Sequence, residues 1–485
     1  MRFQVPATQE VREVPDPLFP AVAAGSAKEA LRFGDRKLTY AELGSVAGAL
    51  AAELPAGRVA VWATPTVHTS VAVVAALLAG VAVVPLNPKI GERELAHILA
   101  DSKPELVLAE PGVELPAALT LPRRDIPLTG EGAPPSEEPD AEAPAFIVYT
   151  SGTTGPPKGV VLPRRAISTT LDALEDAWQW TADDVLVHGL PLFHVHGLIL
   201  GILGPLRRGG SVRHLGRFSL EGVTRELANG ATMLFGVPTM YHRIAETVAD
   251  DEALAGALKS ARLLVSGSAA LPVHDHQRIT AATGQQVVER YGMTETLMNT
   301  SVRADGERKP GSVGVPLAGV ELRLIDESGA EISEPDTVGE IQVRGPNLFT
   351  EYLNRPDATA AALDGGWFRT GDMATRDPDG YVRIVGRKAT DLIKSGGYKI
   401  GAGEIENALL EHPDVAEVAV TGEPDDDLGE RIVAWVVPAG ERPTVEQLAD
   451  HVARLLAPHK RPRVVRYLDA LPRNDMGKVM KRALG

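Results

Sequence analysis

The chain has 485 residues, with 49 Lys and Arg against 64 Asp and Glu, and it contains no cysteine. The lack of cysteine excludes thiol catalysis, disulfide scaffolds and cysteine-ligated metal sites. A formal net charge of −15 disfavours a general binder of nucleic acid or of anionic membranes, so small molecules are the expected partners. A hydrophobic fraction of 44% is typical of a globular protein, and this length predicts about two to four domains.

The N-terminal residues 1–20 do not read as a targeting segment. They mix charges and prolines instead of placing a basic start before an apolar run, so we expect no signal peptide and a cytoplasmic location. The longest apolar stretch, residues 71–86, is interrupted by Gly80 and Pro85 and is shorter than the roughly 20 residues that span a bilayer. It predicts a buried helix, a glycine stop and a strand.

The first half of the chain alternates helical and β-branched patterns, which is typical of βα units around a mostly parallel sheet. Helices are predicted at residues 40–54 and 66–78, and strands at residues 58–62 and 81–85. Residues 110–144 are rich in proline and acidic residues with little periodicity, which predicts a surface excursion or, as the weaker alternative, a domain boundary.

The second half changes pattern twice. Short alternating runs at residues 338–353 and 381–385 predict a strand-rich subdomain. After about residue 387 the pattern predicts a compact α+β unit with the elements helix 403–410, strand 415–421, strand 431–437, helix 444–456 and strand 463–468. No long linker precedes this unit, so a hinge of a few residues would carry any motion.

A loop rich in glycine and hydroxyl groups follows a strand-like run at residues 146–148. It reads Tyr-Thr-Ser-Gly-Thr-Thr-Gly-Pro-Pro-Lys-Gly over residues 149–159. Glycines allow close approach of backbone N–H groups, and hydroxyls and a lysine add donors, so polyphosphate is the natural ligand. It is not a Walker A loop, because Pro157 and Gly159 flank Lys158. The alternative is a glycine-rich surface turn.

Five further motifs follow in order: Tyr-Gly-Met-Thr-Glu-Thr at 291–296, Arg-Thr-Gly-Asp at 369–372, Gly-Arg at 386–387, the segment 396–406 and Gly-Lys at 477–478. Together they resemble the adenylate-forming superfamily of acyl-CoA synthetases, firefly luciferase and peptide-synthetase adenylation domains. The resemblance implies an α/β fold with a large N-terminal adenylation (AMP-binding) domain, residues 1–387, containing mixed and parallel sheets and a β-rich subdomain. A small mobile α+β C-terminal domain, residues 388–485, follows.

The resemblance also implies activation of a carboxylic acid with ATP and Mg²⁺, in which the carboxylate attacks the α-phosphorus and pyrophosphate leaves. Glu295 looks like the magnesium ligand, together with Thr154. Thr294 would bond the α-phosphate, the Tyr291 ring would lie against adenine, and Asp372 would accept the ribose hydroxyls. The implied nucleotide-binding set is Thr150, Ser151, Thr153, Thr154, Lys158, Ser268, Ala269, Ala270, Glu289, Arg290, Tyr291, Gly292, Met293, Asp372 and Arg387.

Lys478 would be a solvated charge if it were judged alone, in a short tail of mixed polarity. Its match to the family's Gly-Lys makes it the expected catalytic lysine, beside Thr294, Glu295 and His194. In the family this lysine bridges the carboxylate and the α-phosphate, then leaves when the C-terminal domain rotates for thioester formation. The hinge is one residue longer than in related synthetases, and Lys388 is the expected pivot, with Ala389 and Thr390 as alternatives.

The segment Phe-His-Val-His-Gly at 193–197 resembles the family's acyl-pocket lining. Adenylation domains for α-amino acids usually carry Asp after the Phe, so His194 disfavours an amino-acid substrate. The alternative for both His194 and His196 is a core imidazole bonded to backbone.

Arg243 lies in a predicted amphipathic helix, and its spacing alone favours an exposed helix arginine. The surrounding segment, with residues 193–197 and 298–301, resembles bacterial malonyl-CoA and methylmalonyl-CoA synthetases. There an arginine holds the distal carboxylate of a small diacid through its planar fork. The implied substrate-binding set is Arg243, Val195, His196, Ser266, Gly267 and Met298.

Coenzyme A is the expected acceptor, because residues 396–399 match the thiol-delivery loop and no carrier domain follows Gly485. The implied CoA-binding residues are Ser395, Gly396 and Gly397. Two alternatives stay open: a stand-alone adenylating enzyme for another short acid or for loading a carrier protein, and a catalytically idle nucleotide or acyl-adenylate binder. The choice between malonate and methylmalonate, the choice between monomer and homodimer, and acylation of Lys478 as a control also stay open.

Overall fold

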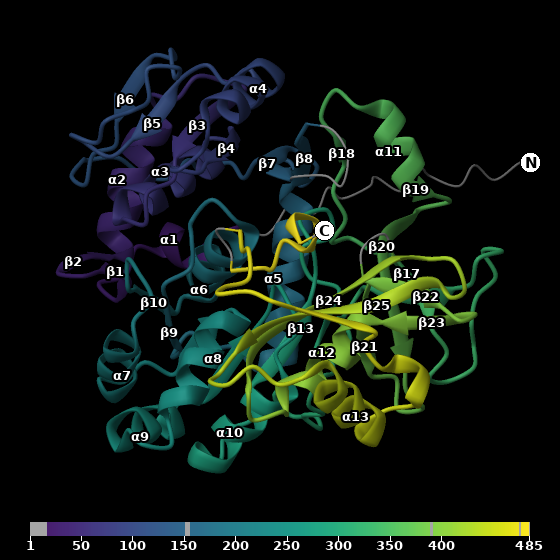
Figure 1. Ribbon diagram of the computed structural model, residues 1–485. Coiled ribbons are helices and arrows are strands. Elements are labelled where there is room, and N and C mark those ends of the chain that lie inside the picture. The colour runs from purple at the N-terminus through teal and green to yellow at the C-terminus, as the bar shows by residue number, and fades with distance from the viewer. Residues whose placement is uncertain (1–16, 151–155, 389–390, 475–476, 485) are drawn as a thin grey trace, which may run out of the picture.

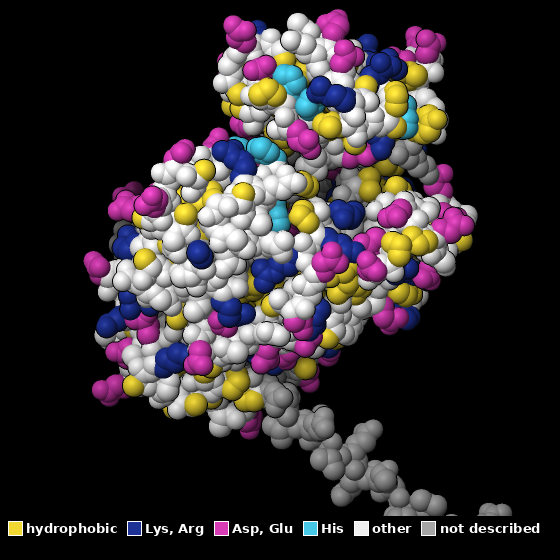
Figure 2. All heavy atoms as spheres, turned by 90° about the horizontal axis from the view of Figure 1, so that it is seen from below, with side chains coloured by type: hydrophobic (Ala, Val, Ile, Leu, Met, Phe, Trp, Pro, Cys, Tyr) yellow, Lys and Arg dark blue, Asp and Glu magenta, His cyan; other side chains and the backbone are white. Residues whose placement is uncertain are grey.

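The computed structural model describes residues 17–150, 156–388, 391–474 and 477–484. Within these ranges the strands form four sheets. Figure 1 shows the purple and blue N-terminal elements at one end, with the yellow-green C-terminal elements lying across the teal and green middle of the chain. In the space-filling view of Figure 2 the molecule has a larger and a smaller lobe with a hollow between them.

One sheet has seven strands: β3 (Arg58–Trp62), β4 (Ala82–Leu86), β5 (Val107–Ala109), β6 (Arg123–Asp125), β7 (Pro144–Thr150), β8 (Lys158–Pro163) and β18 (Glu351–Tyr352). Their order is β18-β8-β7-β4-β3-β5-β6. Strand β8 pairs antiparallel with both β7 and β18, and the other neighbouring pairs are parallel. The two strands predicted at 58–62 and 81–85 are β3 and β4, which confirms the βα reading of this region.

A second sheet has nine strands: β1 (Glu29–Phe33), β2 (Arg36–Thr39), β9 (Val185–His188), β10 (Ser211–His214), β11 (Met233–Gly236), β12 (Leu263–Ser266), β13 (Val288–Tyr291), β14 (Thr300–Ser301) and β15 (Val315–Pro316). They are ordered β15-β14-β13-β12-β11-β9-β10-β1-β2, and β1, β10, β9, β11, β12 and β13 are parallel. Parallel strands need helical crossovers, which places helices on the faces of this sheet.

Helices connect these strands. They are α1 (Pro20–Ala24), α2 (Tyr40–Ala51), α3 (Val67–Leu78), α4 (Glu92–Ser102), α5 (Arg164–Trp178), the π-helix η1 (His196–Leu203), α6 (Gly204–Arg208), α7 (Leu220–Ala228), α8 (Pro238–Thr247), α9 (Glu252–Ser260) and α10 (Val273–Thr283). The helix predicted at 40–54 ends three residues early, at Ala51, although Leu54 still packs, partly buried, against the core.

Helix α3 lies at the centre of the N-terminal core. It contacts β3, β4 and β5 of the seven-stranded sheet and β1 of the nine-stranded sheet, and every one of its residues is buried. A helix that is apolar on all sides needs such an interior position, and each buried Val or Leu contributes about 1.5–3 kcal/mol. Gly80 then ends the helix with φ +69° before β4, as the 71–86 pattern predicts.

The segment 110–144 is packed onto the N-terminal core. Strand β6 lies within it and completes the seven-stranded sheet beside β5. Gly48 of α2 lets the segment approach, because a Cβ there would lie 2.4 Å from the carbonyl carbon of Ala133. The excursion predicted from composition is therefore mostly irregular but continuous with the sheet, which argues against a domain boundary here.

The strand-rich part expected around 338–353 and 381–385 is an antiparallel sheet. Its elements are β16 (Glu321–Ile325), β17 (Gly339–Arg344), β19 (Leu363–Asp364), β20 (Trp367–Arg376) and β21 (Val382–Arg387), with α11 (Pro356–Ala362) beside it. The order is β16-β17-β20-β19, and β21 also pairs with β20. This pairing joins the Asp372 region to the Arg387 region.

The C-terminal part forms a separate sheet with its own apolar cluster, drawn from residues 393–452. Its elements are β22 (Leu392–Ser395), β23 (Tyr398–Gly401), α12 (Ala402–Leu410), β24 (Val415–Asp425), β25 (Gly429–Pro438), α13 (Val445–Leu455), η2 (Pro458–Lys460), β26 (Val464–Tyr467) and η3 (Lys481–Ala483). All five elements predicted after residue 387 are present within a few residues of the predicted bounds. Across the described ranges, no helix is both long and apolar enough to cross a membrane.

Candidate active site

The strand topology gathers the predicted ligand segments at one edge. Strands β9, β11, β12 and β13 run parallel, so their carboxyl ends share an edge of the nine-stranded sheet. The 189–195 loop, helix α8 and the 267–272 loop leave from that edge. Open α/β sheets bind ligands in the crevice at the carboxyl ends of their strands. The segments expected to bind the acyl group and the nucleotide therefore lie together because they follow parallel strands of one sheet.

Asp372 and Tyr291, the residues expected to bind the ribose and the adenine, are in direct contact. The Tyr291 hydroxyl donates to Oδ2 of Asp372 at 2.7 Å, and Nε of Arg387 lies 2.8 Å from Oδ1. Burial raises the pKa of Asp372, while the charges of Arg387 and Lys478 oppose that rise. The three predicted nucleotide residues Tyr291, Asp372 and Arg387 are thus brought together, and Asp372 presents a carboxylate among cations.

The loop after β12 carries local strain. Ser268 has φ +75°, a left-handed conformation that is unusual for a residue with a side chain and is often found at functional sites. Ser268, Ala269 and Ala270 are exposed, so their backbone is open to a ligand. The buried carboxylate of Glu289 supports this loop by accepting bonds from the N–H groups of Leu271, at 3.1 Å, and Gly311, at 3.2 Å. Burial raises the pKa of Glu289 to about 7.

Glu295 and Lys158 meet at Tyr352, in the expected phosphate and metal end. The Tyr352 hydroxyl donates to Oε1 of Glu295 at 2.8 Å, and the Lys158 ammonium lies 4.0 Å from the centre of the Tyr352 ring. The residues Ser151, Thr153 and Thr154, assigned to phosphate and magnesium, lie outside the described residues, whereas Thr150 ends β7 opposite Lys158.

A magnesium ion held here would rely on few protein ligands. No cluster of three or more His, Cys, Asp or Glu side chains that could hold a metal occurs in the described part of the chain. Mg²⁺ typically binds through one or two carboxylates plus substrate phosphates, and Glu295 is a buried carboxylate beside Lys158 and Tyr352. This donor set fits an ion that arrives with ATP.

Lys478 lies on a hairpin that is docked against α8. Its backbone N–H donates to the Asn474 side chain at 2.9 Å, and Asn474 in turn donates its N–H to the Lys478 carbonyl at 2.9 Å. Gly477 has φ +74°, and a Cβ on it would come within 2.7 Å of Thr239 Oγ1. The Lys478 charge acts on Asp372 by lowering its pKa, so the C-terminal lysine faces the expected ribose end.

Arg290 lies beside Gly267 and His196, two of the residues expected to line the acyl pocket. Its side chain is buried, and neither Nε nor Nη2 has a hydrogen-bond partner among the residues that the structure describes. The guanidinium packs against Gly267, where a Cβ would lie 2.2 Å from Cζ. Burial lowers the pKa of Arg290 to about 9. An uncompensated buried charge is costly, so the site is built to receive an anion.

His196 lies close enough to that guanidinium for the Arg290 charge to act on its ring. Burial and the Arg290 charge lower the pKa of His196 well below its usual value, so the ring is neutral. Its Nδ1 lies 3.4 Å from Ser268 Oγ, while its Nε2 and the Ser266 Oγ have no partner in the described ranges. Unpaired buried polar atoms of this kind are expected where a polar ligand group binds.

Val195, Met298 and two glycines bound the expected acyl end. Val195 and Met298 are buried, and a Cβ on Gly292 would lie 2.7 Å from the Met298 methyl group. His196 opens the π-helix η1, and Gly197 packs so closely that a Cβ would lie 2.2 Å from the Pro191 carbonyl oxygen. Rare π-helical segments often occur at functional sites.

The remaining predicted residues are placed less directly. Arg243 is exposed on α8, and its guanidinium lies 5.1 Å from the centre of the Phe218 ring. This conformation does not place Arg243 beside Arg290 and His196. The His194 ring lies 4.5 Å from the Phe193 ring. Thr294 and Met293 are partly buried in the turn after β13. Their assigned roles stay predictions.

Lys388, the expected pivot, and the expected CoA loop both lie in turns. Lys388 pairs with the buried Glu340 of β17, with Nζ and Oε2 2.8 Å apart, whereas residues 389 and 390 lie outside the described residues. Ser395 and Tyr398 pair across a two-residue turn in which Gly396 and Gly397 have φ +58° and +81°. Positive φ at both central positions is the type I′ hairpin pattern that favours glycine.

Sequence reasoning missed Tyr352 and Thr239, and it placed Arg290 with the nucleotide. Tyr352 lies in β18, which reaches the phosphate end only because it pairs with β8. Arg290 alternates with Glu289 along β13, so their side chains project to opposite faces. That alternation was the one signal in the sequence that separates Arg290 from Glu289.

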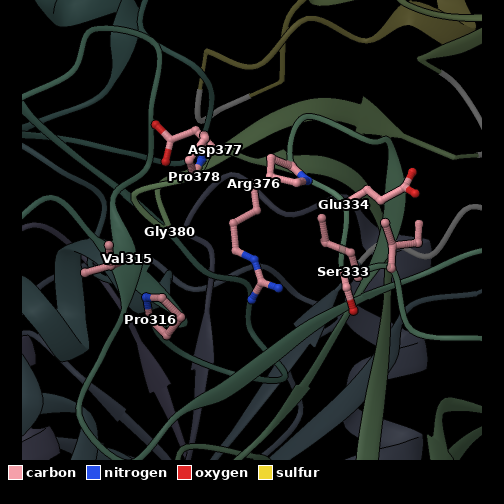
Figure 3. A pocket seen from close by; sticks show the side chains of 11 residues that line it. Val315, Pro316, Ser333, Glu334, Arg376, Asp377, Pro378 and Gly380 are labelled. Carbon is pink, nitrogen blue, oxygen red and sulfur yellow. The ribbon is translucent and has the colours of Figure 1, made fainter.

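A cavity of about 490 Å³ in the β-rich part is separate from this site. Figure 3 shows the Arg376 side chain extending between Pro316 and Ser333, with Glu334 and Asp377 farther out. None of its lining residues belongs to the predicted nucleotide, acyl or CoA sets.

Comparison with known proteins defines the class. The family described as AMP-binding enzyme matches residues 19–353, and its C-terminal domain matches residues 404–478. The chain therefore belongs to the AMP-binding enzyme family, and the predicted adenylate-forming family is confirmed.

Three relatives narrow the comparison. A malonyl-CoA ligase, solved as a ternary product complex with methylmalonyl-CoA and AMP, is 72% identical over 94% of this chain and 100% of that chain, with a TM-score of 0.75. ATP-bound MatB from Rhodopseudomonas palustris is 35% identical over 96% of this chain and 97% of that chain, with a TM-score of 0.87. A malonate–CoA ligase of Arabidopsis thaliana is 36% identical, covering 93% of this chain and 80% of that protein.

Proposed function

We propose that this protein is an AMP-forming acid–thiol ligase that joins malonate or methylmalonate to coenzyme A through an acyl-adenylate. Its similarity to a malonyl-CoA ligase over nearly its whole length supports this activity. ATP, Mg²⁺ and CoA are the small molecules that the reaction requires. A cytoplasmic location, expected from the N-terminal residues, is part of the same proposal.

The buried guanidinium of Arg290 is the observation that carries the diacid assignment. A fatty acid or acetate would leave this charge without a partner, whereas the distal carboxylate of malonate would pair with it. The neutral His196 beside it donates or accepts a hydrogen bond without competing for the negative charge. We assign Arg290 to the acyl pocket and keep Arg243 as a second candidate cation.

Acyl-adenylate formation needs two anions held together. The proximal carboxylate oxygen attacks the α-phosphorus, and the bond from that phosphorus to the β-phosphate bridging oxygen breaks as pyrophosphate leaves. Asp372 and Tyr291 hold the ribose and adenine, Lys158 holds phosphate, and Thr294 bonds the α-phosphate. Glu295 would hold Mg²⁺, which would supply positive charge to the phosphates. Lys478 brings its ammonium to the reacting anions from the C-terminal side.

Thioester formation follows at the same acyl carbon. The CoA sulfur attacks the acyl-adenylate carbonyl, a thioester bond forms and AMP leaves. We assign Ser395, Gly396 and Gly397 to the thiol path, and we place the domain boundary at 387/388 with Lys388 as pivot. The other nucleotide contacts proposed are Thr150, Ser151, Thr153, Thr154, Ser268, Ala269, Ala270, Glu289, Gly292, Met293 and Arg387.

Two placements of the C-terminal domain are supported by the superpositions. The product complex superposes at 0.75 despite 72% identity, whereas the ATP-bound relative superposes at 0.87 with 35% identity. A whole-chain score falls when two parts of a chain are placed differently, whatever their sequence similarity. The docked Lys478 hairpin seen here is what adenylation requires.

The function is tested by turnover of a panel of acids, with and without the buried cation. Wild-type protein should release pyrophosphate with malonate and methylmalonate and much less with acetate, butyrate or succinate. Arg290→Met keeps the apolar volume and removes the charge. Removing one partner of a buried pair costs about 3–5 kcal/mol, so kcat/KM for malonate should fall a few hundred-fold or more.

Arg243→Ala is the matched comparison. If Arg290 holds the distal carboxylate, Arg243→Ala should lower the malonate-to-butyrate ratio much less than Arg290→Met. Butyrate has no second charge, so its turnover in Arg290→Met should fall little or rise. An unchanged malonate-to-butyrate ratio in both variants would rule out both arginines as the partner of the distal carboxylate. A larger fall in Arg243→Ala than in Arg290→Met would assign that role to Arg243.

A further inference from the structure

The Lys478 hairpin is held from within the C-terminal part by Arg473. The Arg473 guanidinium donates from Nη1 to the Gly477 carbonyl oxygen at 2.7 Å, next to Lys478 in the chain. An isolated bridge between Arg473 and Val479 closes the same hairpin. The position of the Lys478 backbone therefore depends on the orientation of the Arg473 side chain.

Glu417 sets that orientation. Its carboxylate on β24 accepts a hydrogen bond from Nη2 of Arg473. The two side chains are about equally accessible, 33% for Arg473 and 31% for Glu417, so the pair is partly screened by solvent. The guanidinium donates from one nitrogen to a carboxylate and from the other to a backbone carbonyl, and these two hydrogen bonds fix its plane.

Across the domain boundary, the charge of Glu417 acts on His242 of α8, which lies one turn after Thr239, the residue that Gly477 of the hairpin approaches. The imidazole Nδ1 lies 3.1 Å from Oδ2 of the buried Asp275 on α10, and Nε2 lies 3.5 Å from Glu246 one turn along α8. The bond to Asp275 raises the pKa of His242, against desolvation, and the charges of Glu246 and Glu417 add to that rise. Carboxylates from α8, α10 and β24 thus surround one ring.

The charged groups of His242, Glu417 and Arg473 thus lead from the N-terminal core to the Lys478 hairpin. We propose that His242, Glu417 and Arg473 are positioning residues that seat the Lys478 hairpin on α8 for acyl-adenylate formation, an inference that rests on the proposed function. The close approach of Gly477 to Thr239 of α8 brings the hairpin next to this array. The array joins α8 to the C-terminal part only when the hairpin is docked.

Breaking the array should slow the first half-reaction selectively. His242→Gln and Glu417→Gln keep the shape of each side chain and remove the charge. Each should lower the single-turnover rate of malonyl-adenylate formation about three- to tenfold, while transfer of supplied malonyl-adenylate to CoA stays near the wild-type rate. The double variant should lose little more than the worse single variant, because both remove the same contact.

Arg473→Lys distinguishes positioning from charge. Lysine keeps the charge but cannot bridge Glu417 and the Gly477 carbonyl with a planar fork, so it should show the same selective loss. His274→Gln and Glu441→Gln are the matched controls, since both residues are exposed and lie outside the array. Melting curves confirm that each variant is folded.

The pH profile gives an independent readout. Because the pKa of His242 is raised, its imidazole is fully protonated below the ordinary value of 6.5. Its contribution to hairpin seating is lost as the pH rises through the raised pKa. The adenylation rate of the wild type should carry a decline over that range that His242→Gln lacks. Thioester transfer should not share this decline.

Several results would overturn the proposal: equal losses in both half-reactions, additive effects of the two charge removals, or an unaltered pH profile in His242→Gln. These results are distinct from failure of the proposed function. That failure would show as an inability of wild-type protein to form malonyl-adenylate at all, whereas the array is tested by the ratio of two half-reactions in a working enzyme.

Discussion

Tyr352 contacts both ends of the phosphate site with one side chain. Its ring lies under the Lys158 ammonium and its hydroxyl donates to Glu295. Burial, together with the neighbouring Glu295, raises the pKa of Tyr352, so the phenol remains a proton donor at physiological pH. This residue therefore positions two groups that the sequence motifs assign separately.

Tyr352→Phe should weaken magnesium-dependent activation without affecting acid recognition. The ring and its contact with Lys158 remain, but Glu295 loses a hydrogen bond to a charged group, which is worth about 1.5–3 kcal/mol. We expect kcat/KM for ATP to fall about 10- to 100-fold, a higher Mg²⁺ concentration for half-maximal rate, and an unchanged KM for malonate. Pyrophosphate exchange measured across Mg²⁺ concentrations checks this, and an unaltered Mg²⁺ dependence would contradict it.

At the scale of elements, the β22–β23 hairpin presents the expected CoA loop on a tight turn. Gly396 and Gly397 both have positive φ, and a Cβ at Gly397 would meet nothing within 4 Å in this arrangement. A side chain at position 397 therefore has room here but strains the backbone by about 1–2 kcal/mol, less for asparagine. Any bulky variant mixes turn strain with obstruction of the thiol path.

Gly397→Asn and Gly397→Leu together separate the two effects. If residue 397 borders the thiol path after domain rotation, both variants should slow thioester formation while adenylation survives, with Leu the worse. If only turn strain matters, Asn should behave like wild type and Leu should lower the melting temperature. Single-turnover rates of each half-reaction, measured beside melting curves, decide. Normal transfer in Gly397→Leu would remove this turn from the thiol path.

At the scale of the whole molecule, Lys478 is the residue that tests the two placements proposed for the C-terminal domain. Its hairpin belongs to the C-terminal part of the chain, yet its charge acts on Asp372 of the N-terminal part. One lysine can serve adenylation in this way and then leave the pocket free for CoA.

Lys478→Ala should abolish most adenylation and leave ATP binding and the transfer of supplied malonyl-adenylate to CoA comparatively intact. Loss of one preorganised donor typically costs about 10²–10³ in rate, and a full charge at two anions could cost more. ATP affinity by titration and the two half-reaction rates are the measurements. Equal loss in both half-reactions would contradict the two-placement scheme.

Local periodicity in the sequence was enough to predict many of the elements. Strand β3 has the predicted bounds, and the five elements predicted after residue 387 occur in the predicted order, because a period of 2.0 or 3.6 residues is set by a few consecutive side chains. Strands β22 and β23, which precede those five elements, were not predicted. The family motifs likewise located Asp372, Tyr291 and Lys478, which the fold brings to one edge. Element ends were less certain, as the early end of α2 shows.

The tertiary structure alone decided which side chains meet. Spacing could not tell Arg290 from Arg243, because the first depends on the face that β13 turns to its neighbours and the second on the rotation of α8 about its axis. Tyr352 contacts Glu295 because β18 pairs with β8, and the charge of Glu417 acts on His242, which is 175 residues away in the sequence. Such contacts depend on strand order and domain docking, which are set by the burial of many side chains at once and leave no local pattern in the sequence.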